Sequence, residues 1–188
     1  MNDAAALHIQ TCVAAMRGRG GAMAEAGVFH GASARLICAA KGEAVLHLFD
    51  VFETLQSPPN GQPGAAETEV RAHFKTVHGR QAQVEALLAP YAGVRLYPGL
   101  FPASAVGLPA DARFAFVHLD LDLPLSTEAA LAFFHPRLIP GAILIGDDHT
   151  DPLVRQVFAA FFAGRADTVI PLPWGQVMVI RQGDPPSA

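Results

Sequence analysis

The stretch FAFVHLDLDLP, residues 114–124, is an apolar run that ends in two carboxylates, Asp120 and Asp122. A second apolar run, GAILIGDDHTD at residues 141–151, also ends in carboxylates, at Asp147 and Asp148. Both runs are apolar at consecutive positions, as expected for strands of a parallel sheet that is covered on both faces. Ionised carboxylates at the edge of such strands cost free energy unless something pairs with them. The partner of these acids is therefore the central question.

Strands and helices alternate along the whole chain. Helices are predicted at residues 4–16, 31–40, 126–138, 151–164 and, as a pair broken near Gly79, at 67–91. Strands are predicted at residues 22–29, 44–50, 94–99, 113–122, 141–148, 168–173 and 175–181. The segment 53–67 is a polar loop rich in proline and glycine. Ser126 or Thr127 is a suitable N-cap for the helix predicted at 126–138. This order predicts an α/β fold with an open, doubly wound sheet.

Length and composition narrow the class of protein. The chain has 188 residues, of which 51% are hydrophobic, and this suits one globular domain. We expect a short N-terminal helix and linker at 1–21, a core at 22–181 and a polar tail at 182–188. The net charge is −4 without a basic stripe, so nucleic acid is not an expected partner.

The remaining compositional evidence favours a cytoplasmic protein. No apolar run approaches the roughly 18 residues that span a bilayer, and the N-terminus lacks the basic start of a signal peptide. The two cysteines, Cys12 and Cys38, form no metal-binding or disulfide pattern, and Cys38 is expected in the core. The pair of strands at the C-terminus would suit a homodimer, although nothing in the sequence requires one.

The four acids of the two quoted stretches fall where doubly wound sheets bind ligands, beyond the carboxyl ends of the strands. Adjacent strands lie about 4.8 Å apart, so Asp120, Asp147 and Asp148 can converge on one point. Their charges would repel unless a cation intervened, and all-oxygen ligands suit Mg²⁺ or another hard divalent cation such as Mn²⁺ or Ca²⁺. Asp122 would share the side of Asp120 if the strand continues, and would then serve as a base. The alternative is a set of unconnected loop acids.

A second constellation surrounds the first predicted strand. The segment EAGVFHGAS contains Glu25, Gly27, Gly31 and Ser33 at a strand-to-helix turn, where glycines let the backbone approach a ligand. Asp50 ends the next strand, in the position where an acid accepts hydrogen bonds from ribose hydroxyls. A tight turn and a solvated acid of purely structural origin are the alternatives.

Two other enzyme classes fit less well. The spacing of the glycines is not the G-x-G-x-x-G of a dinucleotide fingerprint, which counts against an NAD-type oxidoreductase. The DLDLP and GDDHTD segments are similar to motifs of haloacid-dehalogenase-type phosphohydrolases. Fewer than thirty residues separate them here, whereas that family needs most of a domain between its motifs.

The chain resembles class I S-adenosylmethionine-dependent methyltransferases, and specifically the macrocin O-methyltransferase family, over residues 24 to about 181. The resemblance is carried by AEAGVFHGAS (24–33), LFDVFETL (48–55), LYPGLFPAS (96–104) and VHLDLDLPLSTEAALAFFHPRLIPGAILIGDDH (117–149). It implies a Rossmann-like, mostly parallel seven-stranded sheet with an antiparallel last strand. It also implies methyl transfer from S-adenosylmethionine to a hydroxyl of a small metabolite, such as an antibiotic sugar.

The resemblance further implies roles for the matching residues. The methionine part of the donor would be held by Glu25, Gly27, Gly31 and Ser33, the ribose by Asp50, and the adenine side by Gly99 and Phe101. Mg²⁺ would be held by Asp120, Asp147 and Asp148. Asp122 would be the general base, with His149 as a second candidate for base or substrate contact.

Departures from the family pattern concern the acceptor side. Pro124 replaces the tyrosine of the family's D-L-Y segment, Ala142 replaces a glycine, and only about two dozen residues precede the glycine turn. We therefore expect an acceptor site that is cut down, rebuilt for a small or planar hydroxylated molecule, or completed by a partner subunit. The alternative function is a non-catalytic module of the methyltransferase fold that binds the cofactor or a partner.

Overall fold

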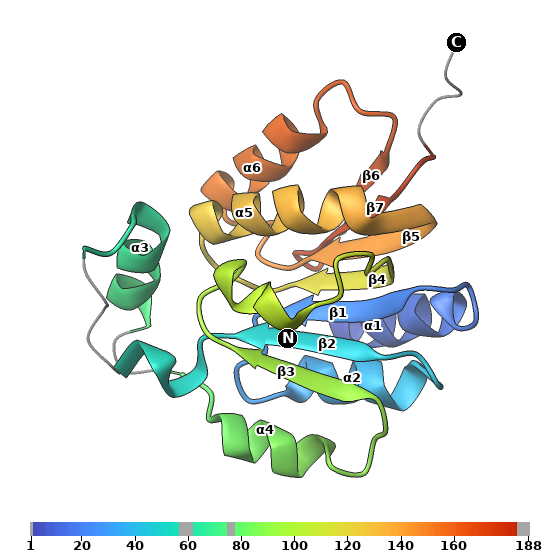
Figure 1. The fold of residues 1–188 in the computed structure, drawn as a ribbon. Coiled ribbons are helices and arrows are strands. Elements are labelled where there is room, and N and C mark those ends of the chain that lie inside the picture. The colour runs from blue at the N-terminus through green and yellow to red at the C-terminus, as the bar shows by residue number, and fades with distance from the viewer. Residues whose placement is uncertain (1, 57–61, 75–77, 184–188) are drawn as a thin grey trace.

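The computed structural model describes residues 2–56, 62–74 and 78–183. Its centre is a seven-stranded sheet with the order β3-β2-β1-β4-β5-β7-β6 (Figure 1). The strands are β1 (Ala22–Ala26), β2 (Leu46–Asp50), β3 (Val94–Pro98), β4 (Phe114–Leu119), β5 (Leu138–Gly146), β6 (Thr168–Pro171) and β7 (Val177–Ile180). All neighbours pair in parallel except β7, which is antiparallel to both β5 and β6. The predicted doubly wound sheet with an antiparallel last strand is confirmed.

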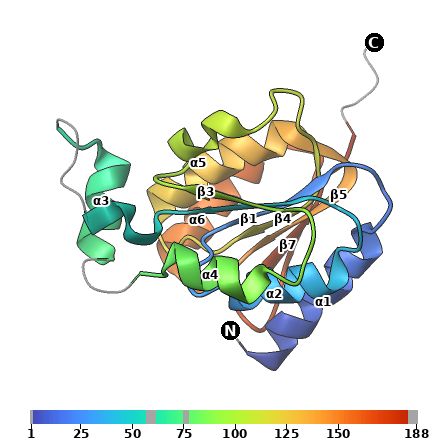
Figure 2. The same ribbon diagram turned by 60° about the horizontal axis from the view of Figure 1, so that its bottom comes forward.

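Helices cover both faces of this sheet, as Figure 2 shows. One face carries α1 (Asp3–Met16), α2 (Ala32–Ala40) and α4 (Gln81–Leu88), and the other carries α5 (Pro124–Phe134) and α6 (Pro152–Phe162). The helix α3 (Ala65–His73) lies beyond the carboxyl ends of the central strands (Figure 1). The described residues also form three short 3-10 helices: η1 (Phe52–Gln56), η2 (Ala103–Gly107) and η3 (His135–Arg137).

Two apolar cores result from the alternation of side chains along the strands. Met23 and Leu48 pack with α1, α2 and α4, whereas Ala24 and Phe49 pack with α5 and α6. Because central strands such as β1 and β2 contribute to both cores, they are apolar at consecutive positions, as the sequence predicts. Cys38 lies in the first core and is buried, which confirms its expected place.

Two predicted boundaries around the fourth strand are wrong. The strand ends at Leu119, and Asp122 has a left-handed φ of +59°, so strand continuation does not place Asp122 beside Asp120. The following helix begins at Pro124 with Leu123 as its N-cap, and not at Ser126 or Thr127. Proline is well suited to the first turn because its missing N–H would have no partner there.

Other boundaries differ by a few residues. The first strand stops at Ala26 rather than 29, the second begins at Leu46 rather than 44, and the fifth begins at Leu138 rather than 141. The predicted loop 53–67 contains most of η1 and the start of α3, while its residues 57–61 lie outside the described residues. The predicted tail is described only at residues 182 and 183. In the part of the chain that the structure describes, no helix combines the length and apolar character that crossing a bilayer requires.

Candidate active site

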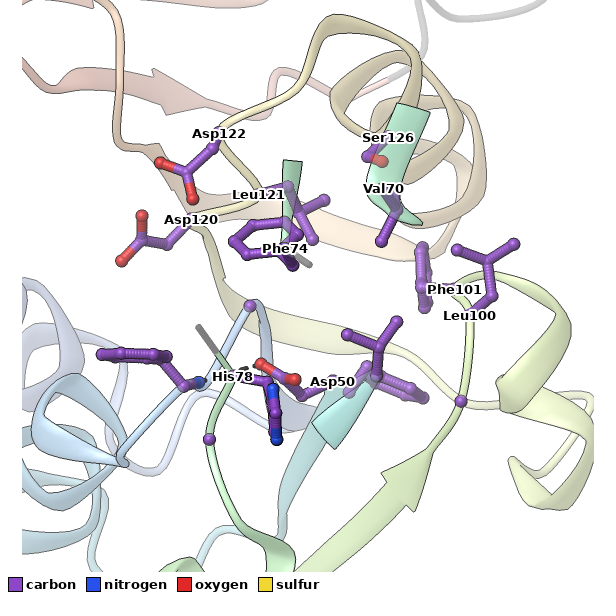
Figure 3. A pocket seen from close by; sticks show the side chains of 16 residues that line it. Asp50, Val70, Phe74, His78, Leu100, Phe101, Asp120, Leu121, Asp122 and Ser126 are labelled. Carbon is purple, nitrogen blue, oxygen red and sulfur yellow. Dashed lines mark hydrogen bonds between the residues drawn. The ribbon is translucent and has the colours of Figure 1, made fainter. Parts of the chain in front are cut away.

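A cavity of about 280 Å³ lies at the carboxyl ends of β1, β2 and β4, where the order of strands reverses direction. In doubly wound sheets this switch point is where ligands bind. Figure 3 shows Asp120 and Asp122 on one side of the cavity, Asp50 and His78 across from them, and Phe101 at a third side. The cavity therefore brings together the end of β2 and the acids that follow β4.

Asp50 joins the glycine turn to the end of β2. Its Oδ2 accepts hydrogen bonds from the backbone N–H groups of Val28 (2.7 Å) and Phe29 (2.8 Å), and its Oδ1 accepts one from Phe52 (2.7 Å). A carboxylate offers about four acceptor positions, so these bonds leave it limited capacity for a ligand hydroxyl. Asp50 therefore shapes the turn as well as lining the cavity.

Gly27 is required by the backbone of the neighbouring strand. A Cβ at this position would lie 1.7 Å from the carbonyl oxygen of Asp120, and the residue has a φ of +87°. The turn after β1 thus passes directly against the end of β4. This contact places the predicted donor turn next to the first of the acids.

The structure separates the seven residues predicted to hold the donor into two groups. Four of them line the cavity: Gly27, Asp50, Gly99 and Phe101. Three do not: Glu25, Gly31 and Ser33. Glu25 is fully buried within the sheet, Gly31 is the left-handed N-cap of α2, and Ser33 is buried in that helix. A direct role of these three in holding the donor stays a prediction.

Phe101 is fixed at its side of the cavity by other aromatic rings. Its ring is stacked on Phe134 at 5.2 Å between centroids and meets Phe49 edge-on at 5.1 Å. Such pairs stabilise a ring beyond the burial of its area. A flat ligand group at this end of the cavity would find a rigid apolar wall.

Among the described residues, side chains at the ends of β4 and β5 form two groups whose oxygen or nitrogen atoms lie close enough together to bind a metal ion. One contains Asp120, Asp122 and Asp148, and the other contains His118, Asp120 and Asp147; within each group the donor atoms lie within 4.8 Å of one another. Asp148, like Asp122, has a left-handed φ, and its Oδ2 accepts the Asp122 N–H at 3.2 Å. Asp120 belongs to both groups, whereas the predicted ligands Asp147 and Asp148 fall in different groups.

The pKa values in this cluster are shifted because its carboxylates are buried close to one another, beside the buried His118. Burial, together with the carboxylates of Asp147 and Asp148, raises the pKa of Asp120 to about 7. Burial and the carboxylates of Asp122 and Asp147 raise the pKa of Asp148 to about 6. The pKa of Asp122 is also raised by burial, although its side chain reaches the surface. Several carboxylates in this arrangement fit a hard divalent cation.

His118 is a member of the cluster to which the sequence assigned no role. It is fully buried, and its Nδ1 lies 2.7 Å from Oε1 of Glu25 on the adjacent strand. Burial alone would lower the pKa of His118, but the carboxylates of Asp147 and Glu25 outweigh burial and raise it to about 10. The available signal was its position two residues before Asp120, since alternate residues of a strand share a face.

Other cavity residues come from segments without a chemical motif. Val70 of α3 and Phe74 after it form an apolar wall, and His78 adds a polar group from the chain before α4. Phe29 of the glycine turn also lines the cavity. His149, the second catalytic candidate, does not line it; its ring lies 5.9 Å from that of Phe158. A catalytic role of His149 stays a prediction.

Solved structures with the same fold include two O-methyltransferases. The O-methyltransferase NovP is 22% identical, with a TM-score of 0.76 over 95% of this chain and 80% of that chain. CalS11, a TDP-rhamnose 3'-O-methyltransferase of calicheamicin biosynthesis, is 20% identical, with a TM-score of 0.67 over 96% of this chain and 80% of that chain. At these identities the likeness concerns the fold.

Sequence comparison goes further. The chain is 32% identical over 156 residues to the 8-demethyl-8-(2,3-dimethoxy-alpha-L-rhamnosyl)-tetracenomycin-C 4'-O-methyltransferase of Streptomyces olivaceus. The match covers 76% of this chain but only 59% of that relative's length. The model of the macrocin-O-methyltransferase (TylF) family matches residues 4–177. The chain belongs to the macrocin-O-methyltransferase (TylF) family.

Proposed function

We propose that the protein transfers a methyl group from S-adenosylmethionine to a hydroxyl of a small metabolite, with the help of a divalent cation. One observation carries the proposal: a single cavity is lined by Gly27 and Asp50 of the predicted donor site and by Asp120 and Asp122 of the acid cluster. S-adenosylmethionine held by Gly27 and Asp50 would therefore lie next to an acceptor hydroxyl held by Asp120 and Asp122.

The donor half of the proposal rests on the ends of β1 and β2. S-adenosylmethionine supplies an electrophilic methyl group when bound. Gly27 leaves room for its approach, Asp50 supplies a fixed carboxylate, and Gly99 and Phe101 form the side of the cavity that suits a flat base. The fixed geometry contributes to the rate because it positions the reacting atoms before reaction.

The acceptor half rests on the acids. We assign Asp120, Asp147 and Asp148 to Mg²⁺ or another hard divalent cation, which lowers the pKa of a hydroxyl when bound. Asp122 takes the proton of that hydroxyl, because its carboxylate lines the cavity and lies within 4.8 Å of donor atoms of Asp120 and Asp148. Proton transfer of this kind contributes about 10²–10⁴-fold to a rate.

A sugar hydroxyl is the acceptor that we propose. The Streptomyces olivaceus relative methylates a rhamnosyl compound by its name, and CalS11 is a TDP-rhamnose methyltransferase. The apolar wall of Val70, Phe74 and Leu121 suits the carbon face of such a ring, while the acids meet its hydroxyls.

The two unpaired, buried cysteines, Cys12 and Cys38, support a cytoplasmic location.

Thermal stabilisation tests the donor and cation together. S-adenosylmethionine, S-adenosylhomocysteine and NAD would each be added with Mg²⁺ and with EDTA. A ligand at 100 times its Kd stabilises a protein by about 2.7 kcal/mol, which is readily seen as a rise in Tm. We expect the two sulfur compounds to raise the Tm and NAD to leave it unchanged. Absence of stabilisation by both would overturn the methyltransferase activity and favour a non-catalytic module.

Methyl transfer itself would be followed with radiolabelled donor and a panel of nucleotide sugars and glycosides. We expect turnover with Mg²⁺ that stops in EDTA. Turnover that is unaffected by EDTA would leave the methyltransferase standing and remove the cation from the proposal.

A further inference from the structure

A buried pair of side chains lies behind the acid cluster, on the face of the sheet covered by α1 and α2. Glu25 of β1 and His118 of β4 are directly opposite each other in the parallel register, and both are 0% exposed. Oε1 of Glu25 lies 2.7 Å from Nδ1 of His118, so one ring nitrogen is held by the neighbouring strand.

The other ring nitrogen points toward the cluster. Nε2 of His118 is buried and has no hydrogen-bond partner among the described residues, and the Asp147 carboxylate is its close neighbour, with Oδ2 at 3.7 Å. This distance exceeds a hydrogen bond, so a hydrogen bond between the two side chains requires a rotation of the Asp147 side chain. The backbone of Asp147 is fixed because its N–H donates to Leu119 O at 2.8 Å, which leaves the side chain as the adjustable part.

We propose that His118, oriented by Glu25, is a positioning residue that holds the Asp147 carboxylate in place for the cation. The inference rests on the cation site of the proposed function and adds to it the residues that orient one ligand. A buried nitrogen without a partner is costly, so Nε2 of His118 needs a polar neighbour, and the Asp147 carboxylate is within reach of it. Partners of this kind that orient metal ligands typically change metal affinity by about 10–100-fold.

Two simpler roles must be separated from this one. A purely structural role would have Glu25 and His118 only joining β1 to β4, yet these strands are already paired by their backbones. A direct role would have Nε2 of His118 bind the cation itself, since it belongs to one of the two donor groups with Asp120 and Asp147.

The chain offers a matched set of variants. In His118→Asn the amide nitrogen takes the place of Nδ1, which keeps the contact with Glu25 and removes the group that faces Asp147. In His118→Gln the amide nitrogen reaches the place of Nε2 and keeps a donor toward Asp147. His47→Asn is the control, because His47 is also a buried strand histidine and its Nδ1 contacts the Tyr97 hydroxyl at 3.0 Å, outside the cavity lining.

Mn²⁺ serves as the probe, and the free ion is titrated by electron paramagnetic resonance at pH 7. We expect His118→Asn to weaken Mn²⁺ binding by about 10–100-fold. We expect His118→Gln to restore most of the affinity and His47→Asn to match the wild type. S-adenosylhomocysteine affinity in EDTA should be unchanged in all three, and the spectrum of bound Mn²⁺ should lack coupling to a coordinated nitrogen.

Three results would overturn the inference while leaving the cation site in place: equal Mn²⁺ affinity in His118→Asn and wild type, joint loss of Mn²⁺ and S-adenosylhomocysteine binding, or nitrogen coupling from a coordinated imidazole. Equal affinity would show that His118 does not affect cation binding. Joint loss would indicate a purely structural role, and nitrogen coupling would make His118 a ligand of the cation. A wild type that does not bind Mn²⁺ would overturn both this inference and the proposed cation site.

Discussion

Replacing Gly27 by alanine tests how closely the turn after β1 must approach the end of β4. The new Cβ would lie 1.7 Å from the carbonyl oxygen of Asp120, and this neighbour is backbone that belongs to a central strand end. The left-handed φ of +87° adds a strain of roughly 1–2 kcal/mol for any residue with a Cβ. Forcing a methyl group into a packed site adds about 1–3 kcal/mol. We expect a loss of about 2–5 kcal/mol in the free energy of unfolding.

Gly18→Ala is the matched control for this substitution. Gly18 has a similar φ of +73°, but nothing lies within 4 Å of the position of its Cβ. It therefore carries the strain of roughly 1–2 kcal/mol without the overlap. Urea unfolding gives the free energy of unfolding of both variants, and the difference between the two values is the cost of the overlap. Mn²⁺ titration should then show weaker binding only in Gly27→Ala, because relief of the overlap displaces Asp120. Equal destabilisation of the two variants would refute the reasoning.

Four further predictions concern single side chains. Burial lowers the pKa of His47 to about 4, so its contribution to stability is present above pH 6.5 and lost as the pH falls toward 4; urea unfolding of His47→Asn should show a shallower loss over that range. The raised pKa of Asp120 has the opposite sign, so in EDTA the Tm of the wild type relative to that of Asp120→Asn should fall as the pH rises from about 4 to about 7. Asp122→Asn should lower kcat by about 10²–10⁴-fold while calorimetric affinities for S-adenosylhomocysteine and Mn²⁺ stay within about threefold; unchanged kcat would remove it as the base. Asp50→Asn turns an amide N–H₂ toward backbone donors, and should cost about 1–3 kcal/mol in urea unfolding and weaken S-adenosylhomocysteine binding at least tenfold; a variant with normal binding would contradict a donor role for Asp50.

The sheet could be predicted because its signal is local and strong. Strands such as Phe114–Leu119 are apolar at consecutive positions, and this pattern arises when both faces are covered. Strand ends were less predictable, because an aspartate is compatible with a strand end, a turn or a helix start. The left-handed conformation of Asp122 and the proline start of α5 are therefore visible only in the folded chain.

The candidate site was predictable where one motif supplies both chemistry and position. Gly27, Asp50 and Asp120 lie at or just after the ends of parallel strands, so topology alone brings them to one edge of the sheet. Val70, Phe74 and His78 were missed because they come from a segment without a chemical motif, and only the packing of α3 and its flanking chain against this edge makes them part of the cavity. The motif predicts that Glu25 holds the donor; the structure buries this side chain within the sheet, and the donor role stays a prediction.

The sequence by itself determined the α/β order, the mostly parallel sheet and the presence of four acids at its carboxyl edge. These features follow from the hydrophobic pattern within short segments and from the order of those segments along the chain. The tertiary structure decided which of those acids bring their carboxylate oxygens close enough together to bind one metal ion. Asp122 and Asp148 meet through two left-handed turns, and Asp147 meets His118 through the pairing of β1, β4 and β5. Contacts of this kind depend on strand register and backbone direction between segments far apart in the chain, and no local pattern encodes them.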